Sequence, residues 1–221
     1  MSHIAHKCAL LTGALLLASV VSASAQVSYS GRAIAARLSA PAMTTQTAGD
    51  TDELPPGGGL LTADAFNVSL LLNDETFTAA SVTDTTSGAN DESHSVSHLN
   101  TVKFTLNQGG ETVIRICGIN ASATASCNGM TATSEVECLW IGDECPDITG
   151  DPNQVIDIPG QGTLVLNEQI TTSLDVTVNA AHLTLNDGTE LILGTARAGV
   201  TGCDVVPVQS TSWGHVKSLY R

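Results

Sequence analysis

Histidines limit the catalytic chemistry that this 221-residue chain can offer, since only four follow its first 25 residues. They are His94, His98, His182 and His215. A serine or cysteine nucleophile needs a neighbouring base, which is most often histidine. The sequence also contains no G-x-S-x-G elbow, no HExxH zinc motif and no phosphate-binding P-loop. We therefore expect no catalytic centre, no metal site and no cofactor.

The pair His94 and His98 has the spacing of a helical metal site but lies in a segment that favours a strand. On a strand, two residues four apart share a face but lie roughly 13 Å apart, too far to hold one ion together. A helix would bring them together, but the intervening residues Ser95-Val96-Ser97 form helices poorly. We interpret both as surface histidines, and His182, in an apolar run, as a hydrogen-bonded structural residue.

The run Asn167-Glu168-Gln169 is the best candidate for a specific site, because it interrupts an apolar strand with three polar residues. Glu168 would share a face with Leu164 and Leu166, so it either ends the strand or is buried with a partner. Arg197 or Arg115 could supply the opposite charge. We favour a structural ion pair here over a ligand site.

Five cysteines follow residue 25, so one must stay unpaired or form an intermolecular bond. In an exported chain these residues favour disulfides over metal ligation. Cys138 and Cys145 bracket a hairpin with its turn at Gly142-Asp143, so we expect these two to pair. The connectivity of Cys117, Cys127 and Cys203 stays open, and Cys203 is a candidate for cross-linking.

Two other features admit alternative functions. Trp140 lies between the hairpin cysteines and could contact a glycan, although aromatic residues make up only 3% of the chain. The 22 acidic residues could include the carboxylate pair of a hydrolase, although adjacent Asp143 and Glu144 at a turn are no evidence of one. The acidic run at Asp50, Asp52 and Glu53 lacks EF-hand spacing, and we expect a solvated loop rather than a Ca²⁺ site.

The elements that must carry these residues are short β-strands. Apolar and polar residues alternate with period two in residues 27–38, 60–72, 102–106, 112–119 and 162–185, and turn residues separate the runs. No run of ten or more residues after the first 25 has helical periodicity with caps. This pattern predicts an all-β fold, an antiparallel β-sandwich that is jelly-roll-like or barrel-like, with little helix. Residues 41–59 are expected to be a flexible loop, residues 84–92 a turn, and residues 204–221 a C-terminal tail.

The alternation breaks once within the last part of the chain. Val176, Val178 and Ala180 define one face, and the apolar set then moves by one residue to Leu183 and Leu185. A straight strand cannot do this without turning its core side chains to the other face. We predict a β-bulge near Ala181-His182.

The first 25 residues have the features of a cleaved secretory signal peptide. An apolar run at residues 9–21 follows Lys7, and Ala23-Ser24-Ala25 is an A-x-A cleavage site. The remaining residues, 26–221, are expected to form a single β domain with no membrane span. Since Lys7 is the only charged residue removed, the mature chain keeps 7 basic and 22 acidic residues, a formal charge of −15. Nucleic acid is therefore a poor partner.

Three segments together resemble the bacterial choice-of-anchor P family: residues 151–169, 174–185 and 194–199. The resemblance is strongest over residues 118–203. The motif residues of interest in these segments are Asn153, Asn167, Glu168, Gln169, Asn179 and Ala180. Members are exported surface proteins whose relatives end in different attachment signals, so the resemblance implies an extracellular or cell-envelope β domain and no reaction.

The chain departs from that family at its C-terminal end, where residues 205–221 hold no LPxTG-like motif and no apolar tail followed by basic residues. We expect a secreted, non-enzymatic structural or adhesive module of the bacterial envelope or extracellular matrix. Its partner would be a cell-surface or matrix protein, a second copy of the chain, or a glycan. A carbohydrate-binding module is the alternative, and a hydrolase of unrecognised type the least favoured.

Overall fold

The computed structural model describes residues 26–72, 75–107 and 111–203, and these belong to one compact unit. They form twelve β-strands and no helix, which confirms the predicted all-β class. Within this part of the chain there is accordingly no helix suited to crossing a membrane. The expected signal peptide and the expected tail at residues 204–221 lie outside the described residues.

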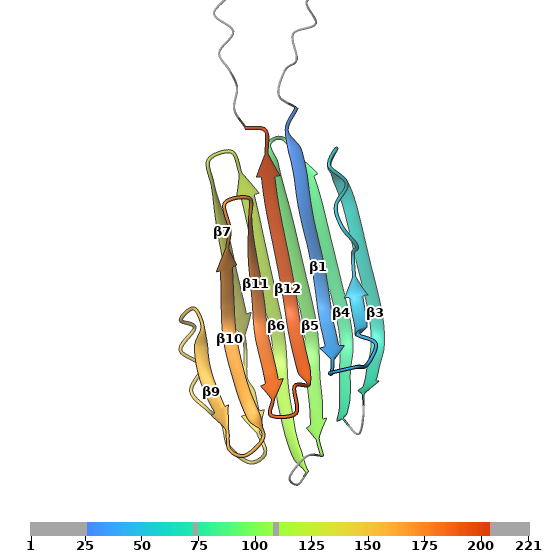
Figure 1. The fold of residues 1–221 in the computed structure, drawn as a ribbon, viewed down its shortest axis with the longest axis vertical. Coiled ribbons are helices and arrows are strands. Elements are labelled where there is room, and N and C mark those ends of the chain that lie inside the picture. Colours follow the sequence, from blue (N-terminus) through green and yellow to red (C-terminus); the bar gives the residue numbers. More distant parts are fainter. Residues whose placement is uncertain (1–25, 73–74, 108–110, 204–221) are drawn as a thin grey trace, which may run out of the picture. The chain divides into compact units, whose positions relative to one another are not determined.

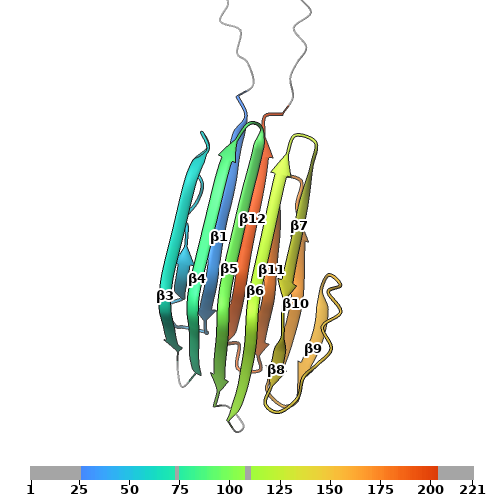
Figure 2. The same cartoon turned by 180° about the vertical axis from the view of Figure 1, so that it is seen from behind.

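Two antiparallel sheets pack face to face (Figures 1 and 2). Sheet A has the strand order β2-β1-β12-β11-β10-β9 and faces the viewer in Figure 1. Its strands are β1 (Ser28–Ser39), β2 (Gln46–Asp50), β9 (Gln154–Ile158), β10 (Gly162–Thr171), β11 (Asp175–Leu185) and β12 (Glu190–Thr201).

Sheet B has the order β3-β4-β5-β6-β7, with the short strand β8 also paired to β6, and faces the viewer in Figure 2. Its strands are β3 (Gly59–Leu72), β4 (Glu75–Ala89), β5 (Glu92–Leu106), β6 (Thr112–Ser126), β7 (Gly129–Val136) and β8 (Leu139–Ile141). The central strands β4, β5 and β6 are each 15 residues long.

Two segments expected to be irregular are partly strands. The predicted loop at residues 41–59 contains β2, and the predicted turn at residues 84–92 is narrower, because β4 continues to Ala89 and β5 starts at Glu92. The polar residues that suggested a turn alternate in burial, with Asp84 and Thr86 fully buried and Thr83 exposed. A strand whose inward residues are small and polar does not show the hydrophobic alternation on which the prediction relied.

The core has two halves of different character. In one half the inward side chains are large, and we call it the large-residue half; they include Phe77, Phe104, Leu106, Ile114, Leu164, Leu183 and Leu191. In the small-residue half they are mostly alanine and serine, including Ala33, Ser93, Ser95, Ala121, Ala123, Ala125, Ala196 and Ala198.

The sheets of the small-residue half approach so closely that side chains of one reach the backbone of the other. Ser93 Oγ donates a hydrogen bond to the carbonyl of Ser30, and Ser95 Oγ donates to that of Arg197, both at 2.6 Å. A Cβ added to Gly31 would lie only 2.7 Å from Thr86 Oγ1. The small side chains are therefore required by the spacing of the sheets.

Where the two halves meet, two neighbouring residues of each long strand of sheet A both point into the core, so the inward positions shift by one residue. The shift occurs at paired positions on all these strands, and we call it the step. In β11 the neighbours Ala180 and Ala181 are both buried, and so are Ala35 and Ala36 in β1. The residues at this level on successive strands are Gly49, Ala35, Gly194, Ala180, Asn167 and Asn153. Four of these six, the two glycines and the two asparagines, have positive φ angles between 51° and 61°.

Sheet B has a matching step, but there two neighbouring residues point outward. Asn100 and Thr101 of β5 are both exposed, between buried Leu99 and Val102. Asn67 and Thr101 have positive φ angles at this level, and the row ends at Cys117 and Cys138.

The predicted β-bulge near Ala181-His182 is therefore wrong, although the alternation of buried residues does shift at this position. The pairing of β10 with β11 keeps one register across the step, with Leu166 opposite Ala181 and Glu168 opposite Asn179. No extra residue is inserted, because the neighbouring strand shifts its alternation at the same level. A single strand read alone cannot reveal that its neighbours shift with it.

Candidate functional site

The step shapes the outer face of sheet A. At the step two neighbouring residues point inward. The outward residues on either side of the step are therefore three positions apart along each strand, instead of two. On the side of the small-residue half, the outward row nearest the step is Ile34, Thr195, Asn179 and Glu168. The nearest row on the other side is Arg37, Ile192, His182 and Val165.

Glu168 joins these two rows. Its Oε2 accepts a hydrogen bond from Asn179 Nδ2 at 2.7 Å and lies 3.0 Å from His182 Nδ1. Asn179 Oδ1 in turn accepts from the hydroxyl of Thr195 at 2.7 Å. His182 is thus the hydrogen-bonded structural residue that the sequence predicted.

The expected ion pair of Glu168 with Arg197 or Arg115 is wrong. Arg197 lies on the same sheet but bonds to the Glu53 carboxylate and lies 3.9 Å from Asp175. Arg115 lies on β6 in the other sheet. Sequence alone could not show that a histidine 14 residues away would face Glu168 across the step.

The motif residues Asn153, Asn167 and Gln169 form a second cluster, which holds the loop before β9. Asn167 Nδ2 donates to the carbonyl of Gly150 at 3.0 Å, while its Oδ1 accepts from Ser134 Oγ at 3.0 Å and Gln169 Nε2 at 3.1 Å. Asn153 Oδ1 accepts a hydrogen bond from the backbone N–H of Gln169. This cluster joins β7, β10 and the loop, so its role is structural.

Ala180, the remaining motif residue, is buried in the core at the step. A Cβ on its neighbour Gly194 would lie 3.1 Å from the Ala180 Cβ and 2.7 Å from Ile119 Cγ2 of sheet B. Asn153, Asn167 and Ala180 all lie at the step, and Glu168, Gln169 and Asn179 adjoin it. The six motif residues therefore build one structural feature.

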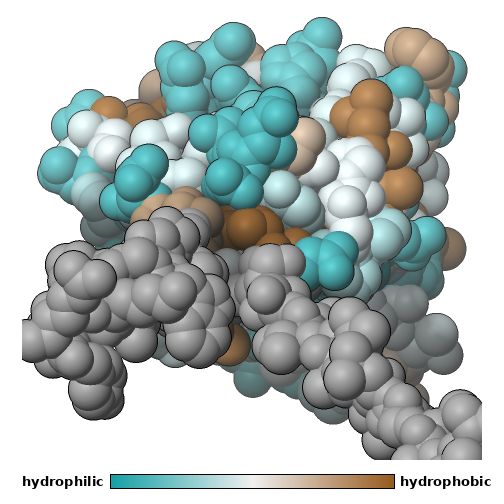
Figure 3. All heavy atoms as spheres, turned by 90° about the horizontal axis from the view of Figure 1, so that it is seen from above, coloured by the Kyte–Doolittle hydropathy of each residue, from teal (hydrophilic) through white to brown (hydrophobic). Residues whose placement is uncertain are grey.

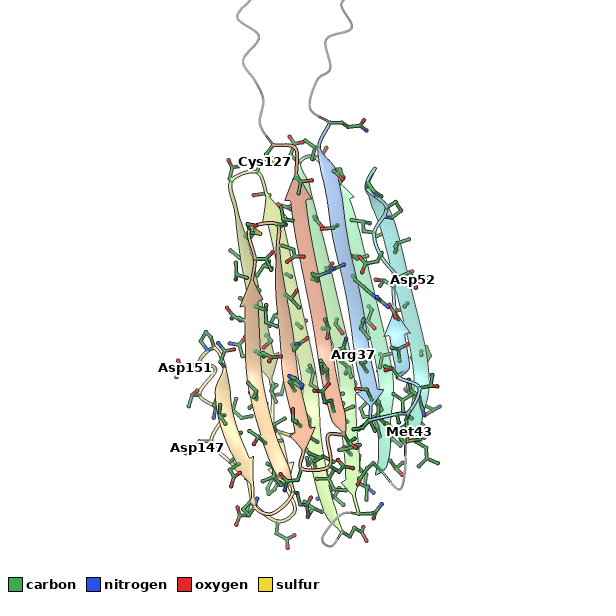
Figure 4. All side chains as sticks on the ribbon, in the orientation of Figure 1. Arg37, Met43, Asp52, Cys127, Asp147 and Asp151 are labelled. Carbon is green, nitrogen blue, oxygen red and sulfur yellow. A yellow bond between two sulfur atoms is a disulfide. The ribbon has the colours of Figure 1, made fainter. Side chains whose placement is uncertain are left out.

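A hollow of about 270 Å³ lies on the outer face of sheet A, over the row next to the step. It is lined by Arg32, Ile34, Arg37, Glu53, Ile170, Thr177, Asn179, Thr195 and Arg197. We call it the outer hollow. Figure 4 labels Arg37 on β1, on the face turned to the viewer.

Carboxylates of the acidic segment pair with arginines at one wall of the outer hollow. Arg32 donates to both carboxyl oxygens of Asp50, at 2.8 and 2.5 Å, and lies 3.7 Å from Glu53. The hydrogen bond from Arg32 lowers the pKa of Asp50, and the same bond raises the pKa of Arg32. The expected solvated loop is thus a structured arm at this point. Among the described residues, no group of three or more acidic, histidine or cysteine side chains could hold a metal ion.

The predicted disulfide between Cys138 and Cys145 is wrong. Cys138 pairs with Cys117, Cys127 pairs with Cys203, and Cys145 is free and exposed. The hairpin around Gly142 does form, but β8 also lies beside β6, which brings Cys117 next to Cys138. Cys203 is therefore not the odd thiol. Disulfides persist in oxidising compartments, so two of them fit an extracytoplasmic protein.

The other candidate contacts are dispersed. Trp140 is 41% exposed on β8, opposite Arg115, and is not enclosed by a disulfide-closed hairpin. His94 and His98 point outward from β5, and His94 Nε2 lies 3.1 Å from Ser122 Oγ. Neither lies near the outer hollow, since both belong to sheet B.

Sequence reasoning missed Asp84 of β4, which is fully buried. Neither of its carboxyl oxygens has a hydrogen-bond partner in this part of the chain, and Oδ2 would lie 2.2 Å from a Cβ on Gly49. Burial raises the pKa of Asp84 to about 8, although Ser97 and the Ala35 backbone lie near enough to lower it somewhat. Asp84 is therefore mainly protonated at neutral pH. No sequence signal distinguishes it from the other acidic residues.

Comparison with known proteins adds little. No protein-family profile matches the chain, and no curated protein sequence matches it significantly. Among solved structures, the chain is similar to Ail, the attachment invasion locus protein of Yersinia pestis, with 11% sequence identity and a TM-score of 0.16. The match covers 79% of this chain and 97% of that one. A TM-score this low supports no conclusion about fold or function.

Proposed function

We propose that this chain is a secreted, non-enzymatic structural or adhesive module of the bacterial envelope, which associates with further copies of itself through the edge strand β3. The observation that carries the proposal is the composition of that edge. β3 is 14 residues long, pairs only with β4, and presents three large apolar side chains to solvent. Phe66 is 78% exposed, Leu60 66% and Leu71 59%.

Edge strands of soluble proteins are normally protected from pairing. Charged residues, proline, short length or a covering loop prevent an exposed row of backbone groups from meeting another strand. β3 has a single charged residue, Asp64, and no proline. β2 contacts β3 near the end of β3, where Gln46 Nε2 donates a hydrogen bond to the Leu71 carbonyl at 2.6 Å. Most of the edge therefore remains suited to pairing.

A second copy is the occupant that fits this edge best. Leu60 and Phe66 project from the outer face of sheet B, and the step brings Leu71 onto the same face. An antiparallel pairing of residues 60–66 in two β3 strands, with the two-fold axis at Ala63, would set each Leu60 opposite the Phe66 of the other copy. Such a contact matches apolar with apolar side chains on one face.

Three further observations support export and a surface role. The N-terminal residues have the pattern of a signal peptide, two disulfides occur in the described residues, and the motif segments resemble an exported surface-protein family. Figure 3 shows the end of the sandwich at which β1 begins. At this end, hydrophobic patches on the surface are separated by hydrophilic ones.

Sedimentation of the secreted chain, residues 26–221, tests the proposal. We expect concentration-dependent association that strengthens with added salt, because salt screens repulsion between two strongly acidic copies. Phe66→Lys should abolish it. Val155→Lys, on the opposite edge strand β9 where Val155 is 65% exposed, is the matched control and should associate as the wild type does. A wild-type chain that stays monomeric, or a Phe66→Lys chain that still associates, would refute the proposal.

A further inference from the structure

The outer hollow has features that the proposed self-association does not use, and it lies on sheet A rather than on the β3 edge. Its lining contains three of the five basic residues in the described part of the chain: Arg32, Arg37 and Arg197. A protein with 22 acidic and 8 basic residues thus gathers most of its described positive charge at one place. An arginine of this group that has no carboxylate partner would favour an anionic ligand.

The three arginines are not equivalent. Arg32 and Arg197 are both engaged by carboxylates of the chain, with Glu53 between them. Arg37 is exposed, and no carboxylate of the described residues lies within ion-pair distance of it. Its guanidinium can therefore receive a ligand carboxylate without displacing a partner.

The floor of the hollow is polar and held in place. Thr195 donates to Asn179, Asn179 donates to Glu168, and His182 fixes Glu168 from across the step. This chain of hydrogen bonds leaves the second amide hydrogen of Asn179 and the lone pairs of Thr195 for a ligand. Thr177, one rung further along β11, adds a hydroxyl. Oriented short donors and acceptors of this kind suit the hydroxyls of a sugar ring.

Apolar side chains flank the polar floor. Ile34 comes from β1, and Ile170 comes from β10 on the opposite side, where it is half exposed. A pyranose ring offers C–H groups as well as hydroxyls, and aliphatic side chains can cover the C–H groups. A small inorganic anion would make no use of either isoleucine.

We infer that the outer hollow binds an acidic oligosaccharide, with the carboxylate of one sugar at Arg37 and a neighbouring sugar with its hydroxyls at Asn179, Thr195 and Thr177 and its C–H face against Ile170. The inference does not depend on the proposed function, because the site is complete within one copy of the chain. The monomeric variant Phe66→Lys should bind the saccharide as the wild type does, so failure of one proposal is distinguishable from failure of the other.

Calorimetric titration of the secreted chain with trigalacturonate tests the inference, with maltotriose as the neutral sugar and acetate as the bare carboxylate. We expect trigalacturonate to bind, and the two other compounds to bind at least about tenfold more weakly. Arg37→Gln and the isosteric Thr177→Val should each weaken binding of trigalacturonate, Arg37→Gln by about tenfold or more. Arg115→Gln on sheet B is the matched charge control and should bind normally.

Several results would overturn the inference. They are absence of trigalacturonate binding, equal binding of maltotriose, acetate binding as tight as that of the trimer, and an equal loss in Arg115→Gln and Arg37→Gln. Circular dichroism of each variant confirms that the fold is kept. Arg37 is exposed and Thr177→Val keeps a β-branched residue in the strand, so neither change removes a core contact.

Discussion

Asn167 connects three parts of the molecule through one side chain. It bonds to Ser134 of β7, to Gly150 of the loop before β9, and to Gln169 of its own strand. Its φ angle of 51° is in the left-handed region, which asparagine adopts more easily than most residues. The hydrogen bonds therefore require an asparagine side chain, and the backbone conformation favours asparagine over most other residues.

Two variants of Asn167 separate these requirements. Asn167→Gly keeps the backbone geometry but loses the hydrogen bonds, whereas Asn167→Ala loses the bonds and also strains the backbone. We expect both to lower the free energy of unfolding, and the alanine variant by about 1–2 kcal/mol more than the glycine variant. Urea unfolding of the oxidised proteins measures the difference. Equal losses of stability would show that the left-handed backbone at residue 167 does not strain alanine.

Asp84 gives the stability of the fold a dependence on pH. Its pKa is raised to about 8 in the folded chain from an ordinary value of 3.8, so the folded chain binds this proton more tightly than the unfolded chain does. The associated stability is fully present below the ordinary value. It is lost as the pH rises toward 8, because the unfolded chain then releases the proton first.

The Asp84→Asn variant tests this linkage. Between pH 4 and 8 the free energy of unfolding of the wild type should fall relative to that of the variant by up to about 1.4 kcal/mol per pH unit. Asparagine has nearly the same shape but does not titrate, so it serves as the reference at every pH. Parallel curves for the two proteins would contradict a raised pKa at Asp84.

At the scale of the strands, the step determines which residues cannot be substituted without loss of stability. Gly194 of β12 has a φ angle of 61° and lies against Ile119 of the other sheet, so it needs both a left-handed backbone and empty space. Gly142, in the turn after β8, has the same φ angle of 61° but nothing within 4 Å of an added Cβ. The two glycines share a backbone conformation and differ in packing.

Alanine at each of these glycines measures the packing at the step. Gly142→Ala should lower the free energy of unfolding only by the backbone term, about 1 kcal/mol. Gly194→Ala should cost about 1–3 kcal/mol more, because its methyl group must displace Ile119 and Ala180. Thermal or urea unfolding of both variants decides the point. Similar losses would mean that the sheets can separate at the step without cost.

Sequence patterns predicted most strands, including β1 with its small inward side chains, and failed in the second part of β4. The predicted strand in residues 60–72 is confirmed, but its single alternation is interrupted by the step, which leaves both Phe66 and Asn67 exposed. The second part of β4 was missed because Asp84 and Thr86 face the core, where the close approach of the sheets admits small polar groups. Burial of such residues depends on the opposing sheet, which local sequence does not specify.

The candidate site was predictable only in part for the same reason. The polar run at Asn167-Glu168-Gln169 stood out, and its structural role was expected. The partners of these residues come from β7, β11 and a loop, and the lining of the outer hollow comes from four strands and the segment after β2. The disulfide of Cys138 was assigned to its near neighbour in sequence, whereas pairing of β8 with β6 selects Cys117.

At the scale of the whole molecule, the described chain is a closed core with one long unprotected edge. The step, the motif residues and the two disulfides stabilise the sandwich, and the outer hollow lies on sheet A, away from β3. β9, at the edge of sheet A, is only five residues long, so it offers less backbone for pairing than β3 does. Of these edges, β3 is thus the one best suited to association between copies of the chain.

Amide hydrogen exchange of residues 26–221 at low and high protein concentration locates such association on individual strands. We predict that exchange slows in β3 as the concentration rises, that β9 exchanges at an unchanged rate, and that Phe66→Lys shows no dependence on concentration. Slowing at β9 instead, or rates in β3 that do not change with concentration, would contradict the account.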